Sequence, residues 1–177
     1  DLMTHLDEAH VFFSAPDGEI IDCSRWHFGR WSCGPEEWLW VGQYEMEIQG
    51  VLRSCIWAHP RTDYELSIQF EDLPPLSRIN GRYGIADAVT DMEGGAPVHL
   101  AVEMGDRTRR LTAENQRGFF SYHISTEHTE GEAPTGVRFT ISTEDAGRRH
   151  FCFTARAFLE RDEPEEVEQS DSGSVGT

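Results

Sequence analysis

Histidine, tryptophan, arginine and carboxylate side chains are the residues of this sequence that could do chemistry or hold a ligand. The eight histidines are widely spread, at positions 5, 10, 27, 59, 99, 123, 128 and 150. A zinc site needs three or four converging ligands, often at short regular spacing. His123 and His128 are five residues apart, and no His-Glu-x-x-His motif is present. The sequence therefore does not predict a histidine metal site.

His59 stands in the segment "CIWAHPRTDYELSIQF", directly before Pro60. A residue that precedes proline is biased toward extended backbone. We therefore predict that His59 ends a strand and leads into a turn, rather than acting as a catalytic base or a metal ligand.

Motifs for catalysis are absent from the sequence. It contains no G-x-S-x-G nucleophile elbow, no cysteine-protease signature and no glycine-rich phosphate or dinucleotide fingerprint. Acidic residues are so abundant that neighbours such as Glu36 and Glu37 do not indicate a glycosidase pair. We predict that the chain is not an enzyme, with a glycan-active hydrolase as the open alternative.

Four of the five tryptophans lie within 15 residues, at positions 26, 31, 38 and 40. Flat aromatic faces stack well on sugar rings, and an exposed group of them is a binding signal. Trp31, Trp38 and Trp40 are the predicted ligand-binding residues. Packing of these tryptophans in the core is the alternative reading.

A second candidate ligand site follows the Pro-Pro pair at positions 74 and 75. Arg78, Arg82 and Tyr83 lie in a segment expected to be a loop. Arginine and tyrosine there could hydrogen-bond a polyol or a carboxylate. A solvated turn is the alternative.

The four cysteines, Cys23, Cys33, Cys55 and Cys152, have no C-x-x-C spacing. An even number without metal-site spacing favours two disulfides and an oxidising compartment. Of the three possible pairings we favour Cys23 with Cys33 and Cys55 with Cys152. The expected location is extracytoplasmic, either periplasmic or secreted; four free thiols in a cytosolic protein are the alternative.

The net charge of −17 comes from 32 acidic residues against 15 basic ones, all of which are arginine. Such a charge repels phosphate backbones and anionic lipid surfaces. No apolar run approaches the length of about 18 residues that a membrane-spanning helix needs. We therefore expect neither nucleic-acid binding nor membrane insertion.

Alternation of apolar and polar residues dominates the chain after residue 10. Leu66, Ile68 and Phe70 share one face of an expected strand, and the segment 98–104 alternates in the same way. About eight to ten such segments, separated by turns, predict an all-β antiparallel sandwich or jelly roll. We assign residues 1–10 to an N-terminal arm, 11–159 to the sandwich and 160–177 to a flexible, acidic, Ser/Gly-rich tail.

The segment from about residue 50 to 158 resembles the galactose-binding-domain-like jelly rolls, which include many carbohydrate-binding modules. Three stretches carry the resemblance: "CIWAHPRTDYELSIQF", "INGRYGIADAVTDMEGGAPVHLAVEMGD", and "GFFSYHISTE" with "GVRFTISTEDAGRRHFCFTA". The resemblance implies a jelly-roll fold. The same fold hosts lectins, adhesion modules, enzyme appendages and assembly subunits.

Jelly rolls of this kind often hold a structural calcium ion, so the resemblance also suggests a metal. "DAVTDMEGG" offers Asp87, Asp91 and Glu93 near a turn, and carboxylate oxygens suit calcium. A solvated acidic loop without metal is the alternative.

Together these features predict a non-catalytic, secreted or periplasmic module that binds a carbohydrate or another cell-surface ligand. The alternative is an accessory structural subunit of a larger assembly, held by its terminal arms and its tryptophan-rich N-terminal part. The two differ in their apolar surface: a lectin has one compact aromatic platform, whereas a subunit has a broad patch.

Overall fold

The computed structural model describes residues 1–90, 92, 96–126 and 132–159, and the predicted tail lies outside them. The elements are η1 (Leu2–Glu8), β1 (His10–Ser14), β2 (Ile20–Asp22), β3 (Arg25–His27), β4 (Arg30–Ser32), β5 (Trp40–Ile48), β6 (Val51–Ala58), β7 (Glu65–Phe70), β8 (Leu76–Ile85), α1 (Asp87–Thr90), β9 (Val98–Met104), β10 (Arg107–Ala113), β11 (Phe119–Ser125), β12 (Val137–Ser142) and β13 (Phe151–Leu159). In this part of the chain, no helix has the length and apolar character needed to cross a membrane.

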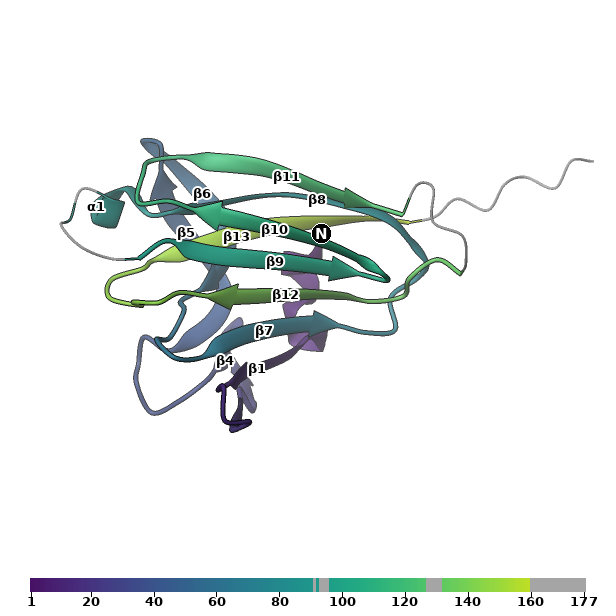
Figure 1. The fold of residues 1–177 in the computed structure, drawn as a ribbon, viewed down its shortest axis with the longest axis horizontal. Helices are drawn as coiled ribbons and strands as arrows, with labels where there is room; N and C mark the ends of the chain where they lie inside the picture. Colours follow the sequence, from purple (N-terminus) through teal and green to yellow (C-terminus); the bar gives the residue numbers. More distant parts are fainter. Residues whose placement is uncertain (91, 93–95, 127–131, 160–177) are drawn as a thin grey trace, which may run out of the picture.

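The strands form two antiparallel sheets that pack face to face (Figure 1). The first sheet has the strand order β10-β9-β12-β7-β1-β2, and the second has the order β11-β8-β13-β6-β5-β4-β3. Strands that are distant in sequence pair within each sheet, such as β1 with β7 and β6 with β13. The structure therefore confirms the predicted all-β sandwich of the jelly-roll type.

The core lies between the sheets and follows the predicted alternation. Along β9, the side chains of Val98, Leu100, Val102 and Met104 are all buried. Aromatic rings meet across the core, where Phe139 of β12 lies 5.0 Å from Phe153 of β13 between ring centroids. Alternation with period two thus turns one face of each central strand toward the opposite sheet.

The structure contains the two disulfides that we favoured from the sequence. Cys55 of β6 is bonded to Cys152 of β13, so the bond ties two neighbouring strands that are 97 residues apart in sequence. Cys23, after β2, is bonded to Cys33, after β4, and so links the first sheet to the second.

The segment "RWHFGRW" forms a hairpin. β3 and β4 pair, with His27 opposite Arg30. The two residues between them, Phe28 and Gly29, have φ values of 50° and 74°. Positive φ at both central residues is the geometry of a tight two-residue hairpin turn, which leaves Phe28 89% exposed at its tip.

Residues at the N-terminus pack against the sandwich. The 3₁₀ helix η1 contacts β4, β5 and β13, and its Leu2 and Leu6 side chains are buried. The Asp1 carboxylate accepts a hydrogen bond from the Met3 amide and caps this helix.

Candidate functional site

The pairing of β5 with β6 collects aromatic side chains on the outer face of the second sheet. Trp57 of β6 lies opposite Gly42 of β5. Trp40 and Tyr44, two residues before and after Gly42, point to the same face of the sheet as Trp57. On its other side Trp57 pairs with Cys152. The neighbours of Cys152 along β13, Phe151 and Phe153, point into the core, so Trp57 points away from it.

Six rings form one contiguous group, which we call the aromatic surface: Trp38, Trp40, Tyr44, Trp57, His59 and His150. Trp40 stacks on Trp57 with centroids 5.4 Å apart, and Tyr44 meets Trp57 edge-on at the same distance. The ring centroids of Trp38, just before β5, and His59 are 4.9 Å apart. The ring centroids of His59 and His150 lie 5.7 and 5.1 Å from that of Trp57.

Exposure differs within the aromatic surface. Trp38 and Tyr44 are 48% and 46% exposed, and Trp40 is half-buried. Trp57 is only 7% exposed and packs beneath them, and its indole Nε1 is buried with no hydrogen-bond partner among the described residues. The surface thus offers flat rings to a ligand.

Strands β4 and β5 approach each other closely at Gly42, beside the aromatic surface. A side chain at Gly42 would meet the Gly29 carbonyl oxygen and Arg30, which are 2.6 and 2.7 Å from an ideal Cβ position. The absence of a side chain there lets β4 lie beside β5, and the Arg30 guanidinium then rests 5.3 Å from the centre of the Trp40 ring.

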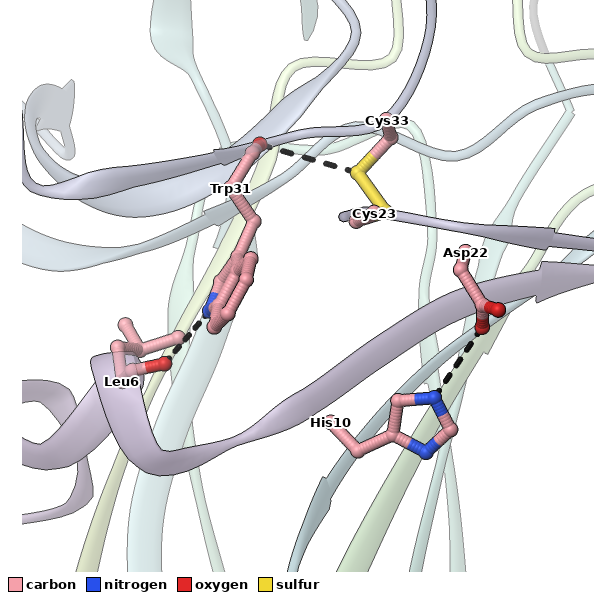
Figure 2. The surroundings of a disulfide bond; sticks show 6 residues. All are labelled: Leu6, His10, Asp22, Cys23, Trp31 and Cys33. Atoms are coloured by element: carbon pink, nitrogen blue, oxygen red, sulfur yellow. Dashed lines mark hydrogen bonds and ion pairs between the residues drawn. A yellow bond between two sulfur atoms is a disulfide. The ribbon is translucent and has the colours of Figure 1, made fainter. Parts of the chain in front are cut away.

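Trp31 lies away from the aromatic surface. It pairs with Val41 and therefore points to the opposite face from Trp40. Its indole Nε1 donates a 2.7 Å hydrogen bond to the Leu6 carbonyl oxygen (Figure 2). The centroids of the Trp31 and Trp26 rings are 5.4 Å apart. Figure 2 also shows the Cys23–Cys33 disulfide beside Trp31. Of the three predicted tryptophans, the structure brings Trp38 and Trp40 together and uses Trp31 to hold η1.

Sequence reasoning missed four members of the aromatic surface: Tyr44, Trp57, His59 and His150. The period of two along β5 puts Trp40 and Tyr44 on one face and was a usable signal for Tyr44. The other three come from β6, the residues after it and the start of β13, so only the strand pairing brings them in. His59 does follow the end of β6, as expected, and is 6% exposed.

Burial sets the protonation of the two histidines of the aromatic surface. It lowers the pKa of His59, against the opposing effect of a 2.7 Å hydrogen bond between Nδ1 and the Pro60 carbonyl oxygen. Burial also lowers the pKa of His150, and the charge of Arg148 acts in the same direction. Both imidazoles are therefore held in the neutral form more strongly than free histidine.

We expect the free energy of unfolding to fall when the pH is lowered below the ordinary histidine pKa of 6.5. In that range the unfolded chain binds protons at these positions that the folded chain excludes, so protonation favours unfolding. Urea unfolding at pH 7.5 and 5.5 measures the loss. The variant His59→Asn, which does not titrate, should lose less over the same range. An equal effect of His27→Asn, at an exposed position, would contradict the assignment.

The structure also separates the residues of the second predicted ligand site, as it separates Trp31 from Trp38 and Trp40. Arg78, Arg82 and Tyr83 lie on strand β8, not in a loop. Arg78 and Arg82 are exposed on the outer face of the second sheet. Tyr83 points inward, is 9% exposed and donates a 3.4 Å hydrogen bond to the Thr112 carbonyl oxygen. Burial raises the pKa of Tyr83, so its hydroxyl stays protonated in the core.

Asp87 is the one predicted calcium ligand within the described residues; Asp91 and Glu93 lie outside them. Its two carboxylate oxygens accept hydrogen bonds of 2.9 and 2.7 Å from the backbone amides of Gln49 and Gly50. These two residues form the tight turn between β5 and β6, with φ values of 57° and 68°. Within the described ranges, no three His, Cys, Asp or Glu side chains are grouped to hold a metal ion. Calcium at this loop stays a prediction.

Asp87→Ala should lower the free energy of unfolding by about 2–3 kcal/mol, because two charge-assisted hydrogen bonds to turn amides are lost. Chemical denaturation measures the change, and Asp87→Asn should lose less because it keeps one acceptor oxygen. If the turn contact is the cause, the stability difference between the wild-type chain and Asp87→Ala persists in excess chelator. If chelation abolishes that stability difference, Asp87 instead holds a bound cation.

In comparisons with known proteins, this chain matches solved structures only. No family model matches the chain, and no curated protein matches it. Solved structures similar to this chain include the CBM51-2 and INT domains of Clostridium perfringens ZmpB, at 10% identity and a TM-score of 0.44 over 66% of this chain. TmCBM61 in complex with β-1,4-galactotriose has 15% identity and a TM-score of 0.33 over 69% of this chain and 72% of its own.

A third similar structure is BtGH115A, a family GH115 4-O-methyl-α-glucuronidase, at 10% identity and a TM-score of 0.33 over 78% of this chain. This chain spans 26% of the ZmpB structure and 18% of BtGH115A. The first two structures contain carbohydrate-binding modules, the class that the sequence resembles. With TM-scores below 0.5, none of the three carries an argument about what this chain binds.

Proposed function

We propose that this chain is a non-catalytic, extracytoplasmic carbohydrate-binding module that holds a glycan on the aromatic surface. The observation that carries the proposal is the contiguous group of rings in which Trp38, Trp40 and Tyr44 remain accessible above the buried Trp57. Aromatic faces bury the C–H faces of sugar rings, and few soluble proteins leave such a compact apolar group uncovered without a ligand.

Polar groups beside the rings would fix the orientation of a bound sugar. The hydroxyl of the exposed Tyr44 can donate a hydrogen bond to a sugar hydroxyl or accept one from it. Arg30, which is exposed and lies over the Trp40 ring, adds further donors at the edge. Apolar stacking with a few well-positioned polar contacts is the usual composition of a small-ligand site.

The two disulfides support an extracytoplasmic location, since such bonds persist in oxidising compartments. The alternative of an accessory structural subunit has less support. Leu2 and Leu6 of the N-terminal segment are buried in this chain's own core, and Trp31 is hydrogen-bonded to the same segment. Leu2, Leu6 and Trp31 therefore pack within this chain instead of forming an exposed arm.

A glycan-array screen of the full chain, followed by calorimetric titration of the best glycan, tests the proposal. Trp38→Ala should weaken binding by about 2 kcal/mol, roughly thirtyfold in Kd, because a stacked ring surface is lost. Phe28→Ala is the matched control: an exposed aromatic residue outside the aromatic surface, whose loss should leave Kd unchanged. Unchanged affinity of folded Trp38→Ala and Tyr44→Ala would contradict the proposal. Absence of binding to every glycan would favour the structural-subunit alternative.

A further inference from the structure

A groove of about 760 Å³ crosses the outer face of the second sheet beside the aromatic surface. Strands β11, β8 and β13 form its floor. Strand pairing sets the outward side chains in rows, with Ser121 beside Arg82 in one row and His123, Asn80 and Arg156 in the next. The following row contains Arg78.

Three of the chain's 15 basic residues meet in this groove, although the chain has a net charge of −17. Arg78, Arg82 and Arg156 are all exposed, and within the described residues none of them forms an ion pair. Arg78 is oriented by the Phe158 ring, 4.1 Å from the centre of that ring. Asp1 also lines the groove, with its carboxylate on the Met3 amide. Clustered guanidinium groups without carboxylate partners point to an anionic ligand.

The chemistry of the groove favours an oxyanion on a sugar chain. The planar guanidinium fork binds carboxylate and sulfate oxygens through two parallel hydrogen bonds. Asn80 and Ser121, between and beside the arginines, can pair with hydroxyl groups. The negative charge of the rest of the molecule acts weakly here, because charges beyond about 8 Å are screened at physiological salt.

The groove and the aromatic surface lie on the same face of the second sheet. Cys152 of β13 lies opposite Trp57, and Thr154, two residues further along the same face of β13, lies opposite Arg82. Two residues of a strand span roughly 7 Å and adjacent strands lie about 5 Å apart, so the backbone positions of Trp57 and Arg82 are roughly 12 Å apart, about two or three sugar units. An oligosaccharide of several units stacked on the rings is therefore long enough to reach the arginines.

We propose that the groove binds the acidic groups of a glycan, carboxylate or sulfate, whose neighbouring sugars stack on the aromatic surface. This inference rests on the proposed carbohydrate-binding function. It assigns the ligand class: an acidic oligosaccharide rather than a neutral one. Arg82 and Arg156 select the charge, and Arg78 extends the groove.

The test compares calorimetric titrations of the full chain with oligogalacturonate, its fully methyl-esterified form and a sulfated oligosaccharide at 50 and 500 mM salt. We expect at least one acidic oligosaccharide to bind tenfold or more tightly than the ester at 50 mM salt, and its advantage to shrink at 500 mM. Comparing the carboxylated with the sulfated ligand identifies the oxyanion. The double variant Arg82→Gln/Arg156→Gln should lose the advantage and keep the affinity for the ester. Arg110→Gln, an exposed arginine on the first sheet, is the matched control and should change neither.

Several results would overturn the inference. Equal binding of the acidic and esterified sugars, or an advantage that survives in the double variant, would show that the groove does not select charge while leaving the aromatic surface intact. Equally tight binding of a polyglutamate peptide would assign the groove to acidic peptides. Absence of binding to every sugar, neutral ones included, would defeat the proposed function and this inference with it.

Discussion

Cys55→Ala/Cys152→Ala is expected to lower the free energy of unfolding by about 5 kcal/mol. The bond closes a loop of 97 residues, and the chain-entropy model gives about 4.7 kcal/mol for a loop of that size. Both cysteines are fully buried, so the double alanine variant also loses packing between β6 and β13. Urea unfolding of the folded variant measures the change.

Cys23→Ala/Cys33→Ala is the matched control for the loop effect. These cysteines are also buried, but their separation is only 10 residues. The same model gives about 2.7 kcal/mol for the shorter loop. If the two double variants lost equal stability, loop closure would not be the main contribution of the Cys55–Cys152 bond.

Phe139→Ala should destabilise the folded state by about 3–5 kcal/mol, the range found when a buried aromatic ring is removed. Phe139 is 0% exposed, and its ring bridges the two sheets, with Phe70 at 6.3 Å and Phe153 at 5.0 Å between centroids. The loss combines the transfer free energy of the ring with the cavity left between the sheets.

Two further variants test that explanation by denaturation. Phe139→Leu keeps most of the apolar volume and should cost less than half as much. Phe28→Ala removes the same ring from an exposed turn and should change stability by less than about 0.5 kcal/mol. A similar cost for Phe139→Ala and Phe28→Ala would refute the position of Phe139 in the core.

The sandwich could be predicted from the sequence because burial and alternation agree along the central strands. Val98 to Met104 and Val137 to Ile141 alternate strictly, and a half-buried strand is the only common element with that period. The disulfide pairing was one choice among three, favoured because Cys23 and Cys33 close a short loop while Cys55 and Cys152 join an early strand to the last one, and the structure has both bonds.

The candidate site depends on which residues of β4, β5 and β6 pair with one another, and the sequence gives only a weak indication of this register. Trp31 and Trp40 are close in sequence, but the register of β4 with β5 pairs Trp31 with Val41 and so puts the two tryptophans on opposite faces. A one-residue change of register exchanges the two faces of a strand, so a local cluster of tryptophans does not reveal which rings are accessible. Trp57 joins Trp40 only through pairing between β5 and β6.

Polar residues were harder still to assign, because their roles depend on partners far along the chain. The carboxylate of Asp87 bonds a turn 37 residues earlier, which local spacing could not reveal. Arg156 joins Arg78 and Arg82 across the pairing of β13 with β8. Tyr83 sits next to Arg82 but points into the core, since neighbouring residues of a strand face opposite sides.

The indole N–H resonances of the five tryptophans, followed by NMR during titration with the best-binding glycan, test the central claim most directly. The proposed site predicts large shifts for Trp38, Trp40 and Trp57. The indoles of Trp26 and Trp31 lie on the opposite face and should stay unchanged, with the bond from Trp31 to the Leu6 carbonyl intact. Saturating glycan that shifts Trp31 and leaves Trp38 and Trp40 unmoved would contradict a binding site on the aromatic surface.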